Sequence, residues 1–202
     1  MSTLALHWST LWGSIGIDAP AGLLDELQRR YSEAHRHYHT LQHLEECLAR
    51  YDELRQAAVH AAEIEFAIWF HDAIYDVTRH DNEEQSAVLV QRALLQAGMS
   101  SQSAAHVYSL VMATRHAAQP TGADECVLVD VDLSILAASP ARFAQYERQI
   151  RLEYGHVPDA VFEPKRRAIL AAFLERPSVF STALFREQYE QAARANLRGA
   201  IG

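Results

Sequence analysis

The spacing of apolar residues is the feature that most constrains the fold, because it repeats every three or four positions along nearly the whole chain. Leu41, Leu44 and Leu48 follow this spacing, as do Val107 and Leu110. It places apolar side chains on one face of an α-helix, whereas a half-buried strand needs strict alternation, which no long segment shows. The sequence therefore predicts an all-α fold of about ten helices. Their expected ranges are 3–15, 20–35, 39–54, 61–72, 82–97, 101–117, 122–138, 140–154, 158–175 and 181–198.

Short breaks that contain proline or glycine separate these ranges. Pro20, Gly98, the segment 119–122 and Pro140 each interrupt a helical pattern. None of the breaks is long enough to link two domains, and the chain holds no internal repeat or low-complexity tract. A chain of 202 residues is long enough to bury about 70% of the surface that its unfolded form exposes. We therefore expect one domain over residues 1–202.

The composition excludes several classes of protein. The net charge of −8 argues against binding to nucleic-acid polymers or anionic membranes, since both need a basic surface. No stretch approaches the roughly 18 apolar residues of a membrane span, and the N-terminus lacks a signal-peptide pattern. The two cysteines, Cys47 and Cys126, are too few for a disulfide framework or a cysteine-based zinc site. A cytoplasmic location is the expectation.

Two pairs of residues have the spacing of a metal site. His39 and His43 lie four positions apart, which puts both imidazoles on one face of a helix. His71 and Asp72 follow the apolar run 64–70 at the expected C-terminal end of a helix, where the macrodipole favours a cation. A carboxylate beside so apolar a segment needs a cation or several hydrogen bonds. The alternative is that the histidines are ordinary half-buried residues and that Asp72 caps the next turn.

A second apolar segment, residues 127–136, contains two further acids, Asp130 and Asp132. Each needs a partner in such surroundings. Two positions along a helix diverge by about 200°, so one ion cannot readily take both. Two neutral imidazoles and two carboxylates would balance a divalent ion. The residues alone leave open which of the two acids is the ligand.

The order of these residues resembles a known pattern. His43, His71-Asp72 and Asp132 are similar to the His…His-Asp…Asp signature of the HD superfamily of metal-dependent phosphohydrolases, which has an all-helical fold. The resemblance implies these four residues as metal ligands and implies an HD-domain-like helical bundle. The chain also resembles a bacterial family described as predicted metal-dependent HD phosphohydrolases. The matching segments are residues 38–41, 69–76, 81–87, 130–133 and 150–154. On that basis the metal-site core is expected at about 36–137 and a C-terminal helical extension at about 140–202.

The resemblance also assigns roles around the ion. The register Asp-Val-Asp-Leu points to Asp132 as the ligand and leaves Asp130 to pair with an arginine or a helix N-terminus. Residues 38–43 are similar to the Tyr-His-Asn-x-x-His motif of cyclic-nucleotide phosphodiesterases, with threonine in place of asparagine. In that motif the first histidine donates a proton, which implies His39 as the general acid; Asp72 is counted among the catalytic residues as well. The expected reaction is attack on phosphorus by an activated water, with His39 protonating the leaving oxygen.

The expected cofactor is one divalent transition metal ion. The mixed nitrogen and oxygen ligands suit Mn²⁺, Fe²⁺, Co²⁺, Ni²⁺ or Zn²⁺. HD proteins with two ions generally have further histidines after the His-Asp pair, whereas this chain offers His80, Glu83, Glu84 and His116 at looser positions. We therefore expect one ion, and a second stays open.

The expected partner is a small phosphorylated substrate, with nucleotides among the candidates. Arg36, three residues before His39, is the preferred phosphate contact because a guanidinium group can bind phosphate through two hydrogen bonds. Arg115 and His116, at the end of a helix, are further candidates for substrate contact, although His116 alternatively caps its own helix. Whether the chain forms a homo-oligomer stays open.

Three acidic residues are expected to support the ligands. Asp76, Glu83 and Glu84 are candidate acceptors of hydrogen bonds from the ligand histidines. Asp81 and Glu84 alternatively form a capping box for the helix that begins near Asn82.

Two other functions stay open at this stage. A di-iron oxygenase on the same scaffold would need extra ligands such as Glu83 and His116. A non-catalytic binding or regulatory protein would hold the ion for structure or sensing and would turn over no phosphoester.

Overall fold

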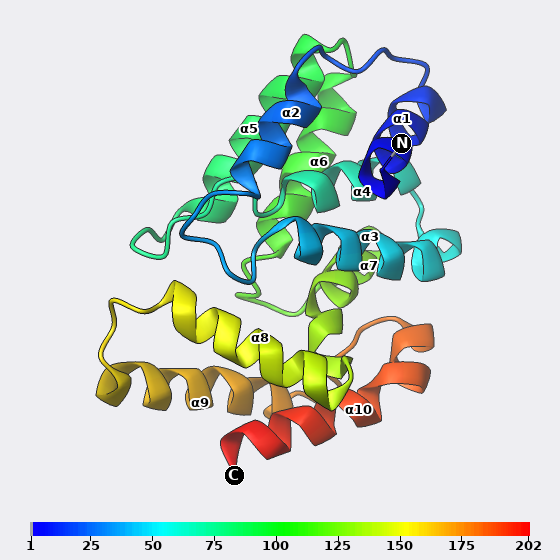
Figure 1. Cartoon of the computed structure of the whole chain (residues 1–202). Helices are drawn as coiled ribbons and strands as arrows, with labels where there is room; N and C mark the ends of the chain where they lie inside the picture. Colours follow the sequence, from blue (N-terminus) through cyan, green and yellow to red (C-terminus); the bar gives the residue numbers. More distant parts are fainter. Residues whose placement is uncertain (1) are drawn as a thin grey trace.

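The computed structural model describes residues 2–202 and contains, in that range, ten α-helices, two short 3₁₀-helices and no strand (Figure 1). The predicted all-α fold is confirmed, and each expected range coincides with one α-helix, although α10 extends beyond the expected end at 198 to Ile201. In chain order the elements are α1 (Thr3–Ser14), α2 (Leu23–Arg30), α3 (Leu41–Leu54), η1 (Arg55–Ala57), α4 (Ala61–Phe70), α5 (Asn82–Gln96), α6 (Ser101–Ala113), α7 (Ala123–Asp132), η2 (Leu133–Ala137), α8 (Pro140–Glu153), α9 (Asp159–Glu175) and α10 (Ala183–Ile201).

Local chemistry sets the ends of several helices. Ser100 and Thr182 accept a hydrogen bond from a backbone N–H in the first turn of α6 and α10. Helix α2 is much shorter than the predicted range 20–35. It begins after Gly22, whose φ of 77° lies in the left-handed region that glycine adopts readily. The predicted range 122–138 divides into α7 and the tighter η2.

The predicted capping box at the start of α5 does not form. The side chain of Asp81 accepts no hydrogen bond from a backbone N–H of the first turn of the helix. Its carboxylate pairs instead with Arg79 at 2.6 Å and with Gln85 at 3.1 Å. The motif alone could not reveal this outcome, because a neighbouring cation competes with the backbone for the same oxygens.

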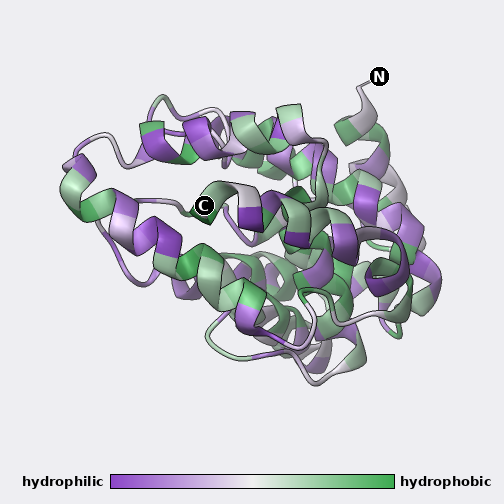
Figure 2. Ribbon diagram, turned by 90° about the horizontal axis from the view of Figure 1, so that it is seen from below, coloured by the Kyte–Doolittle hydropathy of each residue, from purple (hydrophilic) through white to green (hydrophobic). Residues whose placement is uncertain are grey.

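Helix α4 lies at the centre of the fold. Residues 64–70 are all buried, and the helix packs against α1, α3, α5, α6 and α7. The ring centroids of Trp8 and Trp69 lie 4.9 Å apart in an edge-to-face contact. Burying each large apolar side chain contributes about 1.5–3 kcal/mol. The end of α4, which His71 and Asp72 follow, is therefore firmly held. Figure 2 shows that the outer helices, by contrast, carry hydrophilic and hydrophobic residues around successive turns.

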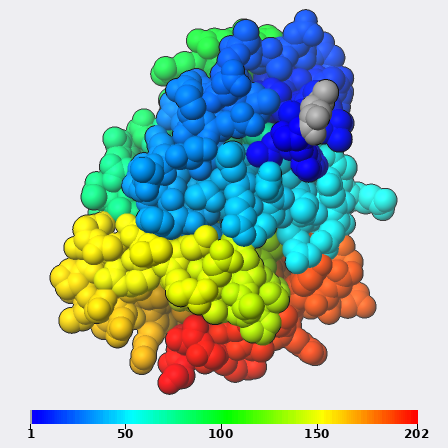
Figure 3. All heavy atoms as spheres, viewed as in Figure 1, coloured from blue at the N-terminus to red at the C-terminus, as the bar shows by residue number. Residues whose placement is uncertain are grey.

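The last three helices lie beneath the first seven in Figure 1 and are joined to them by buried polar contacts. Helices α8 and α9 run in opposite directions, while α8 packs on η2 and α10 packs on both α9 and η2. Asp130 of α7 accepts hydrogen bonds of 2.7 Å from the backbone N–H groups of Ser181 and Thr182, just before α10. It therefore pairs with a helix N-terminus, as the sequence led us to expect. On the face shown in Figure 3, the segment before α3 borders α8 directly.

Within residues 2–202, no helix combines the length and the apolar composition that crossing a bilayer requires.

Candidate metal centre

The four predicted ligands converge where three helices end or begin. His43 lies in the first turn of α3, His71 and Asp72 directly follow α4, and Asp132 ends α7. The Nε2 atoms of His43 and His71 lie 3.1 Å apart. Asp72 Oδ2 lies 3.4 Å from His43 Nε2 and 3.0 Å from His71 Nε2. Asp132 Oδ1 lies 3.4 and 3.6 Å from the same two nitrogens.

These spacings match the distances between neighbouring ligands of a single metal ion. With bonds of about 2.0–2.2 Å, adjacent ligand atoms lie about 3.0 Å apart in an octahedron and about 3.4 Å apart in a tetrahedron. The five distances of the cluster run from 3.0 to 3.6 Å. The two imidazoles are 2% exposed, while Asp72 and Asp132 keep 18% and 16% of their side chains exposed. The donor set therefore fits a divalent ion that can be approached from the carboxylate side.

The hydrogen bond behind His71 fixes how its ring is used. Nδ1 of His71 lies 2.9 Å from the carbonyl oxygen of Ile68, in the last turn of α4. A carbonyl only accepts, so Nδ1 carries a proton, and Nε2 is the nitrogen whose lone pair an ion could use once its own proton is displaced. The acceptor is thus a free carbonyl at a helix end and not one of the predicted acids.

The three acids expected in that role have other partners. Asp76 accepts hydrogen bonds from the backbone N–H of Thr78 at 2.9 Å and from its hydroxyl at 2.7 Å. Glu83 and Glu84 lie 3.7 and 3.8 Å from Arg115. No hydrogen bond joins any of them to a ligand histidine among residues 2–202. Their positions in the sequence suggested that these acids lie close to the ligand histidines. The tight turn after Asp76 does not bring them there.

The cluster has a strong demand for positive charge. Burial raises the pKa of Asp72, but the neighbouring His71 outweighs it and holds this pKa well below its usual range. Burial likewise opposes ionisation of Asp132, while the hydrogen bond with His116 is the largest influence that brings its pKa well below its usual range. Burial lowers the pKa of His71, yet Asp72 raises it well above 6.5. Protons on the imidazoles compensate the carboxylates, and a divalent ion can take the place of those protons.

Cys47 is a donor that the sequence reasoning set aside. It follows His43 by one helical turn in α3, and its Sγ lies 3.6 Å from Nδ1 and 3.7 Å from Nε2 of that ring. Donor atoms of Cys47, His43, His71 and Asp132 all lie within 4.8 Å of one another. The spacing of four from His43 was the available signal.

His39 lies beside the cluster with a carboxylate behind it. Its Nδ1 is 2.8 Å from Oε2 of Glu153, the last residue of α8. Glu153 also accepts the backbone N–H groups of residues 37–39 at 2.8, 2.7 and 3.0 Å, and the hydroxyl of Tyr75 at 2.8 Å. Burial raises the pKa of Glu153, but the hydrogen bond with His39 and the backbone donors bring it down to about 2. Because Nδ1 of His39 is bonded to this carboxylate, Nε2 is the nitrogen that can interact with a molecule in the cleft, which the ring of His39 lines.

The sequence reasoning missed Glu153. It lies 114 residues from His39 in an ordinary amphipathic helix, and although the resemblance at residues 150–154 includes it, nothing in that segment assigned it a role. Only the packing of α8 against the segment before α3 brings the two together.

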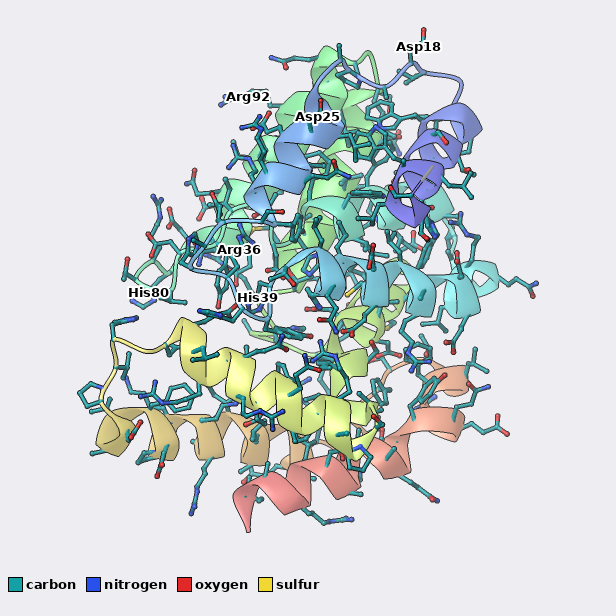
Figure 4. The ribbon with its side chains drawn as sticks, viewed as in Figure 1. Asp18, Asp25, Arg36, His39, His80 and Arg92 are labelled. Carbon is teal, nitrogen blue, oxygen red and sulfur yellow. The ribbon has the colours of Figure 1, made fainter. Side chains whose placement is uncertain are left out.

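The cluster borders a cleft of about 1040 Å³. His39, Asp72 and Asp132 line it from one side, and α8 and α9 line it from the other. Figure 4 shows His39 on the segment above α8 and His80 on the loop before α5. The aromatic residues of the cleft are Tyr38, Tyr75, Tyr146, Tyr154, Phe162 and Phe173, and its cationic residues are Arg79, Arg115, Lys165, Arg166 and Arg176.

Arg115 and His116, expected to contact substrate, both line this cleft. Nε2 of His116 also lies 2.9 Å from Oδ2 of Asp132, so this ring holds the carboxylate of a predicted ligand in place. His116 has a φ of 53°, which is uncommon for a residue other than glycine. Its Nδ1 atom is buried with no hydrogen-bond partner among the described residues.

Arg36, the preferred phosphate contact, has a different role. Its side chain is 0% exposed and does not line the cleft. The guanidinium donates to the carbonyl oxygens of Asp72, Ala73 and His39 at 2.7, 3.2 and 3.2 Å, and to Glu33 at 3.0 Å. This burial leaves no donor for a substrate phosphate, so the expected role is not supported. Arg36 ties the segment that holds His39 to the segment that holds Asp72, and Figure 4 shows Arg36 and His39 on the same stretch of chain before α3.

Comparison with known proteins adds no identification, because no protein-family model, curated protein or solved structure matches the chain.

Proposed function

We propose that this chain is a metal-dependent phosphohydrolase that acts on a small phosphoester with one divalent transition metal ion. The observation that carries the proposal is the set of five donor distances between 3.0 and 3.6 Å on the edge of a cationic cleft. The all-helical fold and the His/Cys/Asp cluster are compatible with an HD domain. Membership of the HD superfamily is part of the proposal.

His43, His71, Asp72 and Asp132 would hold the ion, and their mixed donors suit Mn²⁺, Fe²⁺, Co²⁺, Ni²⁺ or Zn²⁺. A divalent ion in such a site polarises a phosphoryl oxygen and lowers the pKa of a water molecule toward neutrality. The two carboxylates face the cleft with 18% and 16% of their side chains exposed. Their remaining lone pairs can orient the attacking water by accepting a hydrogen bond from it, which gives Asp72 its catalytic role.

His39 supplies the proton for the leaving oxygen. With Nδ1–H donated to Glu153, protonation at Nε2 creates an imidazolium that the buried carboxylate stabilises. The ring of Tyr75 lies 4.1 Å from the ring of His39 and limits its rotation. General acid catalysis of this kind contributes about 10²–10⁴ in rate.

The cleft favours an anionic substrate with a flat or apolar part. Lys165 and Arg176 line it, and neither forms an ion pair nor donates a side-chain hydrogen bond within residues 2–202. These two cations can bind phosphate oxygens, and an aromatic ring such as Tyr154 can stack on a base. The guanidinium of Arg176 lies 4.5 Å from the ring centroid of Phe173, in a cation–π contact. A volume of about 1040 Å³ is at the upper end of small-molecule sites. We therefore place nucleotides first among the phosphoesters to be tested.

One ion at this cluster agrees better with the contacts than two. A binuclear centre would need further ligands such as Glu83 and His116, and Glu83 lies 3.7 Å from Arg115. His116 holds Asp132 at 2.9 Å. This favours hydrolysis over di-iron oxygen chemistry.

The test is elemental analysis of the purified protein followed by a phosphoester screen with the metals found. The screen includes nucleoside mono- and diphosphates, cyclic nucleotides, sugar phosphates and nitrophenyl phosphate. Turnover should disappear on chelation, return when the metal is restored, and be absent in His71→Ala. Full metal content without turnover on any substrate would favour a binding or regulatory protein. Two irons per chain, both lost in His71→Ala, would favour an oxygenase.

A further inference from the structure

A second group of imidazoles and carboxylates lies at the opposite end of α4. His60 directly precedes this helix, Glu63 lies in its first turn, and His106 lies on α6. One donor atom from each of the three lies within 4.8 Å of the other two. The ring centroids of His60 and His106 are 5.0 Å apart, with 73° between the planes. Three side chains of types that bind metals thus lie close together between the start of α4 and helix α6.

A buried carboxylate orients the first of these imidazoles. Asp124 of α7, whose side chain is 6% exposed, lies 2.8 Å from Nδ1 of His60. It also accepts the backbone N–H groups of Val59 at 2.7 Å and of His60 at 3.2 Å. Because Asp124 accepts at Nδ1, the lone pair of His60 is at Nε2. A carboxylate behind a histidine is the arrangement that commonly supports a metal ligand.

The other two side chains form a hydrogen-bonded pair. Nδ1 of His106 is bonded to the carboxylate of Glu63, and the side chains are 33% and 12% exposed. A metal ion can displace the proton that this pair shares. A cavity of about 470 Å³ lies in front, lined by His60 and Glu63 together with residues 98–100. Water from this cavity can complete the coordination of an ion.

We propose that His60, Glu63 and His106 bind a second divalent transition ion of the zinc type. Two imidazoles and one carboxylate, with a water in the fourth position, are a ligand set that suits tetrahedral Zn²⁺. Mg²⁺ and Ca²⁺ prefer oxygen ligands throughout and do not suit the site. The ion ties the start of α4 to α6, and so holds the helix whose other end carries the ligands His71 and Asp72.

The two sites are separate. Helix α4 spans ten residues, which puts its ends about 15 Å apart. The two ions of a binuclear centre lie only about 3.5–4 Å apart. A second equivalent of metal in this protein is therefore not evidence for a binuclear centre at His71.

The test is titration of the metal-stripped protein with Co²⁺, whose visible spectrum reports coordination, followed by competition with Zn²⁺. The wild-type chain should bind two equivalents. His106→Ala and His71→Ala should each bind one, and the double variant none. His156→Ala, which removes an exposed imidazole outside both clusters, should still bind two. The proposal is overturned if His71→Ala binds no ion while it stays helical, or if His106→Ala retains two.

Glu63→Gln separates metal binding from a purely structural contact. The amide oxygen still accepts a hydrogen bond from His106, but it is a poorer ligand than a carboxylate. In the His71→Ala background, this change should weaken Zn²⁺ binding by more than about tenfold. It should also remove the rise in melting temperature that Zn²⁺ produces in that background. Unchanged Zn²⁺ affinity in Glu63→Gln overturns the assignment, whatever the outcome at the other cluster.

Discussion

Replacing Glu153 with glutamine tests the connection between α8 and the proposed proton donor. The side chain of Glu153 is 0% exposed. Burial raises its pKa, but the hydrogen bond with His39 and the backbone donors lower it from 4.5 to about 2. At about 1.4 kcal/mol per pKa unit, this fall stabilises the native state by about 3 kcal/mol. The stabilisation is complete above the unfolded pKa of 4.5 and is lost as the pH falls through about 2.

Glu153→Gln removes the charge at every pH. At neutral pH the variant should therefore have a free energy of unfolding about 3 kcal/mol below that of the wild type, out of a total of about 5–15 kcal/mol. The difference should shrink below pH 4.5, because there the unfolded wild-type chain takes up a proton at Glu153 while the folded chain stays ionised down to about pH 2. Urea unfolding, followed by circular dichroism from neutral pH to about pH 3, measures both quantities. A difference below about 1 kcal/mol at neutral pH, or one that does not change with pH, would refute the reasoning.

The same variant has a catalytic effect that a purely structural contact would not produce. Glu153→Gln should keep its metal and lose more kcat with a poor leaving group than with a nitrophenolate, because nitrophenolate needs little protonation. His39→Ala should show the same pattern with a larger loss. Equal losses for good and poor leaving groups in both variants would show that His39 does not donate the proton.

Other side chains of the centre differ in their expected effects on metal content, stability and substrate binding. His71→Ala should lower bound metal from two equivalents to one while the protein stays helical, because only the ion proposed at His60, Glu63 and His106 remains; two bound equivalents would contradict the role of His71 as a ligand. Asp132→Asn should reduce metal content and abolish turnover. Asp130→Asn should keep its metal and lower the free energy of unfolding by about 1–3 kcal/mol, since Asp130 accepts two backbone N–H groups; metal analysis and thermal melting distinguish the two. Arg36→Ala should destabilise the fold by about 2–4 kcal/mol through the carbonyls it leaves unbonded, whereas Lys165→Ala should raise KM and leave stability unchanged, as steady-state kinetics and urea unfolding would show.

The parts of the site that sequence predicts are those encoded by spacing within one helix or at its end. The apolar spacing placed every helix, because burial of one face is what holds each helix in the fold. His71 and Asp72 stood out because these polar residues directly follow the fully apolar run 66–70. Different roles could be predicted for Asp130 and Asp132 because side chains two positions apart on a helix point to different sides. In the structure one faces α10 and the other faces the cluster.

The parts that sequence does not predict depend on contacts between distant segments. Arg36 lies three residues from His39, but its function is set by carbonyl oxygens 36 and 37 residues further along the chain. Glu153 looks like any exposed glutamate until α8 packs over residues 37–39. Asp81 shows the opposite problem. The capping-box motif is present in the sequence, but the carboxylate of Asp81 pairs with the neighbouring Arg79 and does not cap the helix.

The two halves of the proposed chemistry come from different parts of the chain. The metal cluster is built entirely from the ends of α3, α4 and α7, none of which needs the C-terminal helices for its donor atoms. The proton donor takes its orientation from Glu153 on α8, and two cations of the cleft, Lys165 and Arg176, lie on or directly after α9. Metal binding and turnover are therefore separable. Substitutions in α8 and α9 should leave the ion in place and change kcat or KM, because they alter what surrounds the substrate and not what holds the metal.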